Sequence, residues 1–519
     1  MNNIIWIIIA FVVYVAVMIV IGTFSYKRNT NLSEYFLGGR NLNAWVAALS
    51  AQASDMSGWL LMGLPGAVYA LGTGQVWIAV GLGIGTILNW IIVAKRLRRY
   101  TIVSGNSITI PEYLENRFHD TSKILRIASA IFIAIFFAVY TASGFVAGAT
   151  LFEQIFGLNY NLSLVIGVVF ILAYTFLGGF RAVCWTDLIQ GLLMFAAILL
   201  VPIVAYATIA DTALLPVGFT DVLGDGAGGT QSAISVVSQL AWGLGYFGMP
   251  HVLVRFMAIK SDKTVRKSAI IAIIWVAVTL IFAIITGLVG KMALVDLADS
   301  ETVFIVLIQR LFLSEGAVAY APLLGGFFLC GILAAIMSTA DSQLLVTASS
   351  FTSDIYKNAL HKGAGDRHLV WVSRVSVIVI AAIAFIIATN RTSSIMGLVS
   401  NAWSGFGSTF GALVLLSLYW RRVNRAGAFA GVISGGLTVI IWDYIPVGAG
   451  ETLAAATGVY SLLIGFIVSF LFTVVVSLVS APPSKAMLDE FETVRGAADV
   501  DALADPNRSD SAFTPDRRE

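Results

Sequence analysis

Long apolar stretches are the feature that most restricts how this chain can fold. A run of about 20 apolar residues is long enough to cross a bilayer as a helix. Inside hydrocarbon, a helix pairs every backbone N–H and C=O within its own segment. We therefore predict an all-α polytopic membrane protein. Its thirteen expected transmembrane helices lie near residues 4–24, 45–66, 76–94, 124–149, 161–180, 187–209, 232–256, 268–292, 319–347, 371–389, 396–419, 427–444 and 456–480.

Composition supports this class. Hydrophobic residues make up 58% of the 519 residues, and only 12% are charged, whereas about a quarter are charged in a soluble protein. Twenty Lys and Arg fall in alternate loops between the expected helices, and the opposite loops contain only Arg310 and Arg391. Because loops rich in basic residues stay in the cytoplasm, we expect the amino terminus outside and the carboxy terminus inside.

Two of the thirteen runs are interrupted in their middle. The second contains SAQASDMSGW at residues 50–59, and the seventh contains WGLGYFGMPH at residues 242–251. Ser, Asp and Gly favour turns, and Pro lacks a backbone donor, so both helices are expected to unwind there. Glycines could instead serve close helix packing. Unwound backbone within a membrane lines a cavity or is buried in protein, and matched interruptions in two halves point to a transporter binding site.

The spacing of the interruptions predicts an internal repeat. Each interrupted run opens a block of five runs, and a repeated block with an odd number of crossings must return with inverted topology. We divide the chain accordingly into the first helix with its following loop, two inverted repeats, two final transmembrane helices and a cytoplasmic tail that we expect to be mostly disordered. These parts cover residues 1–44, 45–209, 210–419, 420–480 and 481–519.

The ninth run contains a possible cation site. Ala335, Ser338, Thr339 and Ser342 follow helical spacing and share one face. Their hydroxyls, with carbonyls freed in the second run such as those of Ala53 and Met56, would offer oxygens to Na⁺. Intramembrane Ser and Thr more often bond back to their own helix. Intramembrane carboxylates are costly unless paired, so a cation or a proton is expected near Asp55, Asp187 and Asp341.

Aromatic residues flank both interruptions. They suggest a cage for a compact apolar ring with a cationic nitrogen, and backbone N–H groups near Ser57 and Gly58 would bind a carboxylate. The expected partner is therefore a small zwitterion. The aromatic residues are Trp59, Tyr140, Trp242, Tyr246 and Phe247.

Other classes fit poorly. The chain has no G-x-x-x-x-G-K-[ST] loop for an ATP-driven pump, and of its four histidines only His251 falls near an interruption, which argues against an intramembrane enzyme. The 39 residues after 480 are too few for a sensor domain. A net charge of +2 gives no indication of nucleic-acid binding. Apart from the lipid bilayer and the solute, no obligate partner is evident.

Several stretches together resemble the sodium/solute symporter family, and within it the proline carriers. They are YFLGGR at 35–40, LSAQASDMSGWLLMGLPG at 49–66, YTFLGGFRAVCWTDLIQ at 174–190, WGLGYFGMP at 242–250 and ILAAIMSTADSQLL at 332–345. The resemblance implies a leucine-transporter-type five-plus-five inverted repeat. It also implies a bacterial inner-membrane Na⁺ symporter, with proline the leading substrate and pantothenate or another small carboxylate the alternative.

The resemblance also assigns residues. It implies a Na⁺ site built from the carbonyls of Ala53, Met56 and Ala335 and the hydroxyls of Ser338 and Thr339, supported by Asp55. It implies that proline contacts Ser57, Gly58, Trp59, Tyr140, Trp242, Tyr246, Phe247 and Pro250. In sialic-acid-type relatives, the positions matching Thr339, Asp341, Ser342 and Asp187 surround a second Na⁺. Met249 stands where proline carriers usually have Gln, so exact substrate identity depends on this position.

Overall fold

The chain folds into one bundle of helices. A computed structural model describes residues 2–26, 32–175, 179–208, 215–226, 228–294, 296–314, 321–361, 363–447 and 450–496. With η marking short 3-10 and π segments, the first part contains α1 (Asn2–Tyr26), α2 (Leu32–Leu37), η1 (Gly38–Arg40), α3 (Ala44–Asp55), η2 (Trp59–Gly63), α4 (Leu64–Leu71), η3 (Thr73–Gln75), α5 (Val76–Leu88), η4 (Asn89–Ala94), α6 (Lys95–Val103), α7 (Ile110–Arg117), α8 (Ile124–Phe156), α9 (Tyr160–Thr175) and α10 (Phe180–Thr208).

The second part is also almost entirely helical. It contains α11 (Ala233–Leu240), η5 (Ala241–Phe247), α12 (Pro250–Met257), α13 (Asp262–Ala293), η6 (Ser300–Thr302), α14 (Val303–Phe312), α15 (Ala321–Ser349), η7 (Ser350–Leu360), α16 (Asp366–Ala388), α17 (Ile395–Phe406), η8 (Gly407–Gly411), α18 (Ala412–Tyr419), α19 (Arg425–Tyr444), α20 (Leu453–Thr457), α21 (Ser461–Val479) and α22 (Lys485–Gly496). A two-residue hairpin pairs β1 (Pro446–Val447) with β2 (Glu451–Thr452).

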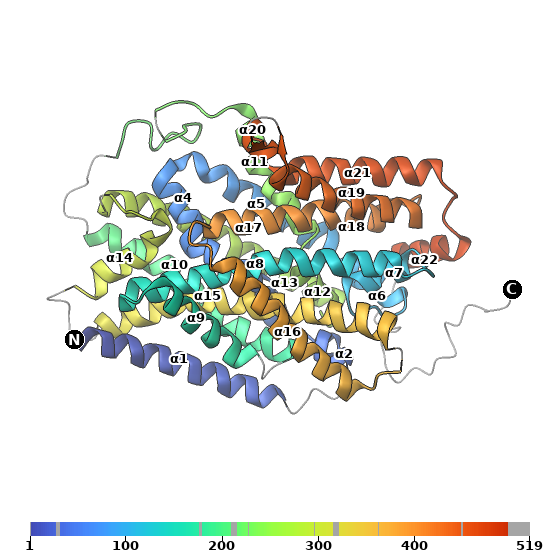
Figure 1. The fold of residues 1–519 in the computed structure, drawn as a ribbon, viewed down its shortest axis with the longest axis horizontal. Coiled ribbons are helices and arrows are strands. Elements are labelled where there is room, and N and C mark those ends of the chain that lie inside the picture. Colours follow the sequence, from blue (N-terminus) through green and yellow to red (C-terminus); the bar gives the residue numbers. More distant parts are fainter. Residues whose placement is uncertain are drawn as a thin grey trace.

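The long helices run side by side (Figure 1), with α1 along one edge and α21 at the opposite edge. The centre is formed by α8, α10 and α15. Helix α15 contacts both α8 and α10, and it also contacts α1. Helix α8 contacts α9 and α17 as well. The interrupted helices pack against this centre, since α3 contacts α10, α13 and α15. The interruption of α3 is therefore enclosed by protein.

The apolar runs of the sequence became helices as expected. Ten helices of the described residues are long and apolar enough to cross a membrane. The other three expected runs correspond to the interrupted helix α3–η2–α4, to the shorter α9, and to the interrupted helix α11–η5–α12. The polytopic membrane fold is thus confirmed, and the count of thirteen crossings stays a prediction.

Helix starts follow local capping chemistry. The side chains of Asn43, Thr109, Ser261, Ser394 and Asn424 each accept a hydrogen bond from a backbone N–H three residues later. Each such cap satisfies one of the four unpaired donors at a helix start, which contributes about 1 kcal/mol. These residues explain where α3, α7, α13, α17 and α19 begin.

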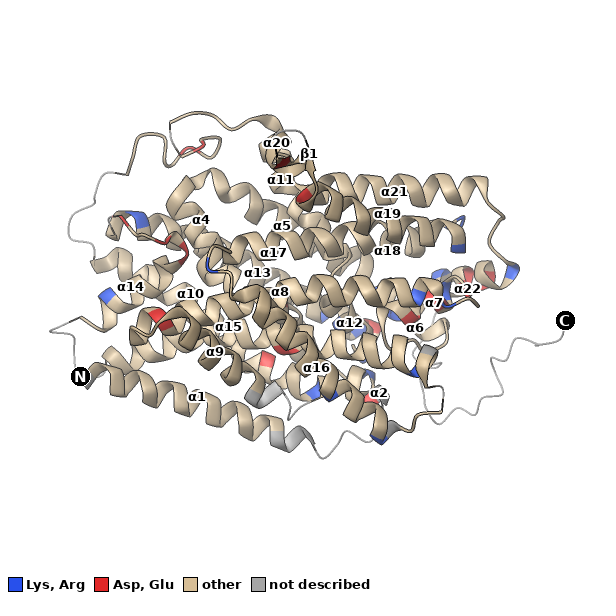
Figure 2. Cartoon of the chain, in the orientation of Figure 1, with Lys and Arg blue, Asp and Glu red and all other residues tan. Residues whose placement is uncertain are grey.

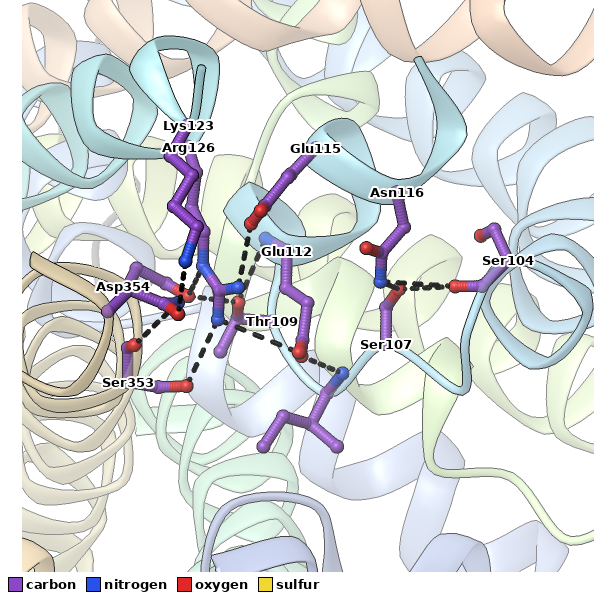
Figure 3. Close-up of polar contacts among 12 residues, drawn as sticks. Ser104, Ser107, Thr109, Glu112, Glu115, Asn116, Lys123, Arg126, Ser353 and Asp354 are labelled. Atoms are coloured by element: carbon purple, nitrogen blue, oxygen red, sulfur yellow. Dashed lines mark hydrogen bonds and ion pairs between the residues drawn. The ribbon is translucent and has the colours of Figure 1, made fainter. Parts of the chain in front are cut away.

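Charged residues gather at one end of the bundle, around α6, α7 and α22 (Figure 2). A buried ionic network ties this end together (Figure 3). Arg126 of α8 donates from Nε to Oδ1 of Asp354 in η7 at 2.7 Å and from an η nitrogen to Glu115 of α7 at 2.7 Å. Thr109 also donates to Asp354 at 3.0 Å. Breaking such a buried pair costs about 3–5 kcal/mol, so the network holds three elements in fixed register.

The tail contains more order than expected. Residues 485–496 form α22, whose apolar face packs on α6 and buries Met487, Phe491 and Val494. Phe491 lies 6.5 Å from the ring of Tyr100. Residues 497–519, where the rest of the expected disordered tail falls, lie outside the described residues.

Small residues form the seam between α19 and α21. Gly427 and Gly431 of α19 face Ser477 and Thr473 of α21 so closely that an added Cβ would collide with them, and a Cβ at Gly435 would collide with the Ser408 carbonyl of η8 and press on Ser469. Such stripes let helix backbones approach in a membrane, where no hydrophobic effect drives association. The two helices form a tight pair that also packs on η8.

Candidate functional site

The first interruption follows Asp55. Met56 has φ −86° and ψ 80°, outside the helical region, and α3 ends before it. The carbonyl oxygen of Asp55 accepts hydrogen bonds from Trp59 Nε1 and from the Tyr140 hydroxyl, both at 3.1 Å. Both of these aromatic side chains are buried. The unwound backbone is therefore enclosed in protein, and side chains satisfy part of it.

The second interruption lies beside the first. Residues 241–247 form the 3-10 segment η5, and Met249 is extended, with φ −75° and ψ 105°, before Pro250 opens α12. The Tyr246 hydroxyl donates to Oδ2 of Asp55 at 2.6 Å. Asn89 Nδ2 in turn donates to the carbonyl of Tyr246 at 3.0 Å. A carboxylate from one interruption is thus held by a hydroxyl from the other.

Hydroxyls of α15 face the end of α3. Ser338 Oγ lies 2.7 Å and Thr339 Oγ1 3.3 Å from the carbonyl oxygen of Ala53. Ser338 Oγ is also 3.3 Å from the carbonyl oxygen of Ala335. All these residues are buried. The arrangement brings backbone and hydroxyl oxygens together next to an unwound segment, which is the kind of donor set that binds Na⁺ in transporters.

A cavity of about 910 Å³ reaches the second interruption from the end of the bundle that carries Glu301 and Arg391. Trp242 is the one predicted site residue among those lining it, and Gly63 of η2 lines it as well. The indole of Trp242 stacks on Trp403 and on Tyr460, with ring centroids 6.4 and 5.2 Å away. Trp242 therefore stands between the cavity and the buried site.

Comparison with known proteins decides the family. The model of the sodium:solute symporter family matches residues 35–435. The chain belongs to the sodium:solute symporter family.

Relatives within this family cover nearly the whole chain. The osmoregulated proline transporter OpuE of Bacillus subtilis is 45% identical, over 92% of this chain and 96% of its own length. The high-affinity proline transporter PutP of the same species is 45% identical, over 91% and 98%. The sodium/proline symporter of Staphylococcus aureus strain JH9 is 44% identical, over 93% and 94%. The family resemblance read from the sequence is confirmed.

Solved structures share the fold. A Na⁺-coupled sialic acid symporter, in a substrate-bound outward-open state, aligns with a TM-score of 0.74 at 20% identity, covering 92% of this chain and 99% of its own. Mhp1, a nucleobase-cation-symport-1 family transporter, aligns with a TM-score of 0.53 at 14% identity, covering 88% and 98%. This chain therefore has the fold of these symporters.

The structure of this symporter family member groups the predicted residues unevenly. Asp55 lies with Trp59, Tyr140 and Tyr246, and Ala53 lies with Ser338 and Thr339. Met56 contributes its sulfur to a contact with Thr279. Phe247, Met249 and Pro250 are buried beside the second interruption, and Ser57 and Gly58 are buried at the first. Trp242 reaches this group through Trp403, whose ring centroid lies 6.4 Å from that of Trp242 and 5.0 Å from that of Tyr246.

Asp187 lies in a separate group centred on a residue that sequence reasoning missed. Arg255 of α12 donates from Nε to Ser50 Oγ at 3.1 Å and from an η nitrogen to Asp187 Oδ2 at 3.2 Å. The same nitrogen contacts Ser342, whose hydroxyl lies 3.4 Å from Asp341 Oδ1. The signal available in the sequence was Arg255 itself, a basic residue inside the expected span 232–256 and five positions after Pro250.

Proposed function

We propose that this chain is a secondary active transporter that couples inward Na⁺ movement to uptake of L-proline by alternating access. The observation that carries the proposal is the meeting of the Ala53 carbonyl with the Ser338 and Thr339 hydroxyls beside an interrupted helix. The names of relatives at 44–45% identity supply the substrate.

Na⁺ binds between α3 and α15 in this proposal. Its ligands are the carbonyl oxygens of Ala53, Met56 and Ala335 and the hydroxyl oxygens of Ser338 and Thr339. Both hydroxyl oxygens lie within hydrogen-bond distance of the Ala53 carbonyl, and a hydroxyl that rotates its hydrogen toward another acceptor presents a lone pair to the ion. Asp55 supports binding as a nearby charge and through its link to Tyr246.

Proline binds between the two interruptions. Its carboxylate accepts hydrogen bonds from the backbone N–H groups of Ser57 and Gly58. In the structure the Ser57 N–H donates to the Asp55 carbonyl at 3.1 Å, and this bond is replaced by one to the proline carboxylate. The pyrrolidine ring and its cationic nitrogen lie against aromatic faces, which attract cations. The contacting side chains are Trp59, Tyr140, Trp242, Tyr246, Phe247, Met249 and Pro250.

The membrane arrangement follows from the charged end. We place thirteen crossings in a bacterial inner membrane, with the end that carries α6, α7 and α22 in the cytoplasm and the amino terminus outside. The cavity beside Trp242 then opens to the exterior, and residues 45–209 and 210–419 form the two inverted repeats.

Uptake of labelled proline into proteoliposomes tests the proposal. Accumulation is expected with an inward Na⁺ gradient and not with K⁺ in its place. Thr339→Val should raise the Na⁺ concentration for half-maximal uptake at least tenfold. Thr347→Val is the matched control, since Thr347 lies two turns further along the same helix and bonds back to Gln343 at 2.7 Å. Na⁺-independent accumulation, or equal effects of both variants, would contradict the Na⁺ site.

A second substrate class fits the same mechanism. Met249 stands where proline carriers usually have Gln, and it is buried in the second interruption, where the substrate is proposed to bind. Na⁺-dependent uptake of pantothenate or another small carboxylate, without uptake of proline, would assign that substrate instead. Met249→Gln would then be expected to increase proline uptake, and no change would exclude Met249 as the selecting residue.

A further inference from the structure

The surface formed by η7 and α16 holds a groove that lies apart from the site described above. It encloses about 610 Å³, and α16 packs on η7 beside it. Helix α16 is one of the helices apolar enough to cross a membrane, and its lining side chains Trp371, Val375 and Val379 are 66, 45 and 52% exposed. Large apolar side chains left exposed in this way mark a surface that meets lipid or an apolar ligand.

Most of the groove is apolar, and its polar groups lie at one end. Seven of its ten lining residues are apolar, so an apolar occupant fits most of its length. The Ser376 hydroxyl bonds back to the Val372 carbonyl of its own helix at 2.8 Å. The other two polar residues, Tyr356 and His368, share a hydrogen bond of 2.9 Å between Oη and Nε2. His368 lies in the first turn of α16, so the polar end of the groove is the end at which this helix begins.

This polar end lies at the charged end of the bundle and is basic. Segment η7 is joined to the charged end through Asp354, which accepts a hydrogen bond from Arg126 (Figure 3). The sequence from 356 to 368 contains one carboxylate, Asp366, against three Lys or Arg and two His. These basic residues are Lys357, His361, Lys362, Arg367 and His368. The rings of His361 and His368 lie 5.8 Å apart, and the surplus of positive charge beside them complements an anion.

The length of the groove matches one leaflet of a bilayer. Its lining on α16 runs from His368 to Ile380. This distance is about 18 Å at the rise of an α-helix, and one leaflet contributes about 15 Å of hydrocarbon. Trp371 lies one turn from His368, and Trp is enriched near the membrane surface. The chain's own tail is a poor occupant, since residues 497–519 have large apolar side chains only at Val500, Leu503 and Phe513.

We propose that this groove binds an anionic phospholipid from the leaflet at the charged end of the bundle. The phosphate group lies among Lys357, Arg367 and His368, and one acyl chain lies along Trp371 and Val379. Any phospholipid can place a chain against an apolar face, so the apolar part of the groove sets the position of the lipid. The basic end selects the head group, because each Lys or Arg near the membrane surface attracts anionic lipid.

The first test concerns the head group. The purified full chain in detergent is titrated with dioleoylphosphatidylglycerol, or with dioleoylphosphatidylcholine, which has the same chains and no net charge. Stabilisation against thermal unfolding should saturate at a lower concentration of the anionic lipid. Arg367→Gln should raise that half-saturating concentration about fivefold, the equivalent of about 1 kcal/mol for one basic residue.

The matched control is Lys263→Gln, which removes an exposed charge from the same end of the bundle. It should leave the titration with phosphatidylglycerol unchanged. Equal titrations with the two lipids, or equal effects of the two variants, would overturn the proposal.

The second test locates the acyl chain. Bromine atoms on a lipid chain quench the fluorescence of a Trp that the chain touches, and the difference in emission between wild type and Trp371→Phe isolates Trp371 from the other tryptophans. In phosphatidylcholine vesicles, brominated phosphatidylglycerol should quench Trp371 at a lower mole fraction than brominated phosphatidylcholine does. Equal quenching by the two lipids would show that Trp371 meets only bulk lipid, and the proposal would fail.

A pair of variants on one helix tests the groove itself. Val379→Trp places a bulky ring in the groove, whereas Ile383→Trp places the same ring one turn beyond the lining residues, at a side chain that is 46% exposed. Val379→Trp should raise the half-saturating concentration of phosphatidylglycerol several-fold, and Ile383→Trp should not. Unchanged binding in Val379→Trp, or equal loss in both, contradicts the proposed acyl position. None of these measurements uses proline or a Na⁺ gradient, so they stand apart from the test of the proposed function.

Discussion

At the scale of single residues, Asp55 links the two interrupted helices. Its carbonyl accepts hydrogen bonds from Trp59 Nε1 and the Tyr140 hydroxyl, and its carboxylate accepts one from Tyr246 of the second interruption. A displacement of Asp55 at the cation site therefore changes the hydrogen bonds of these aromatic side chains directly.

Tyr246→Phe removes the hydrogen bond to Asp55 while keeping the ring. A hydrogen bond to a charged group contributes about 1.5–3 kcal/mol, and about 1.4 kcal/mol is a factor of ten. We expect the Na⁺ concentration for half-maximal uptake to rise by about ten- to a hundredfold in proteoliposomes. Tyr444→Phe, which removes an exposed hydrogen bond to Asn401 at 2.8 Å, is the control. Equal responses would show that Tyr246 does not act through Asp55.

Glu301 predicts a pH dependence outside the membrane-spanning helices. Its carboxylate accepts from the backbone N–H groups of Ile395 and Met396 at 2.9 and 2.8 Å, at the start of α17. Burial raises the pKa of Glu301 above its ordinary value of 4.5, and the nearby negative charge of Asp299 adds to this rise. The two backbone hydrogen bonds lower the pKa, but they do not cancel the effect of burial. The folded chain therefore holds this proton more tightly than the unfolded chain does.

The sign of the effect follows by linkage. The stability contributed by protonated Glu301 is fully present below pH 4.5 and is lost as pH rises through the higher pKa of the folded chain. Relative to Glu301→Gln, the wild-type unfolding temperature should fall across that window and then level off. Thermal unfolding of both chains between pH 4 and pH 8 measures this. A difference that is constant, or that grows in favour of wild type with rising pH, would contradict it.

At the scale of elements, α5 and η5 are held together by glycines. A Cβ at Gly85 would overlap the carbonyl of Gly243, and one at Gly81 would overlap the backbone of Leu240. On the same helix, a Cβ at Gly83 would meet only Leu280, at 3.9 Å. The second interruption is therefore positioned by direct backbone contact with α5.

Gly85→Ala should separate these two backbones, whereas Gly83→Ala should not. Overpacking of this kind costs about 1–3 kcal/mol, which lowers the unfolding temperature by a few degrees in a chain of this size. Uptake should fall with it because η5 carries Trp242 and Tyr246. Thermal unfolding and proline uptake of both variants check this. Comparable effects of the two substitutions would exclude backbone contact as the cause.

The sequence predicted the elements better than their contacts. Long apolar runs and Gly, Pro and Asp placed the helices and both interruptions, because these features act locally. The position of Trp242 at the cavity that Glu301 and Arg391 line depends on Trp403 and Tyr460, which lie 161 and 218 residues further along the chain. The pairing of Asp187 with Arg255 likewise depends on how α10 and α12 meet. Neither arrangement has a local sequence signal.

At the scale of the whole molecule, the two cysteines allow the orientation to be tested. Cys184 and Cys330 are both buried, so the background reaction with a membrane-impermeant maleimide should be low. A cysteine introduced at Ser393, which lines the same cavity as Trp242, should react from the outside of intact cells if the proposed orientation holds. One introduced at Lys263, near the charged end, should react only in inside-out vesicles. The reverse pattern would invert the proposed topology.

The glycine seam between α19 and α21 bears on how the chain is made. The most apolar stretch of α19 has a mean hydropathy of 1.5, against 2.8 for α21, so α19 partitions less readily into lipid by itself. It is also the earlier of the two to leave the ribosome. Gly427 and Gly431 gain their close packing partners only when Thr473 and Ser477 of α21 arrive. Biogenesis of the last pair is thus expected to be concerted, with α19 waiting at the insertion machinery until α21 has been synthesised.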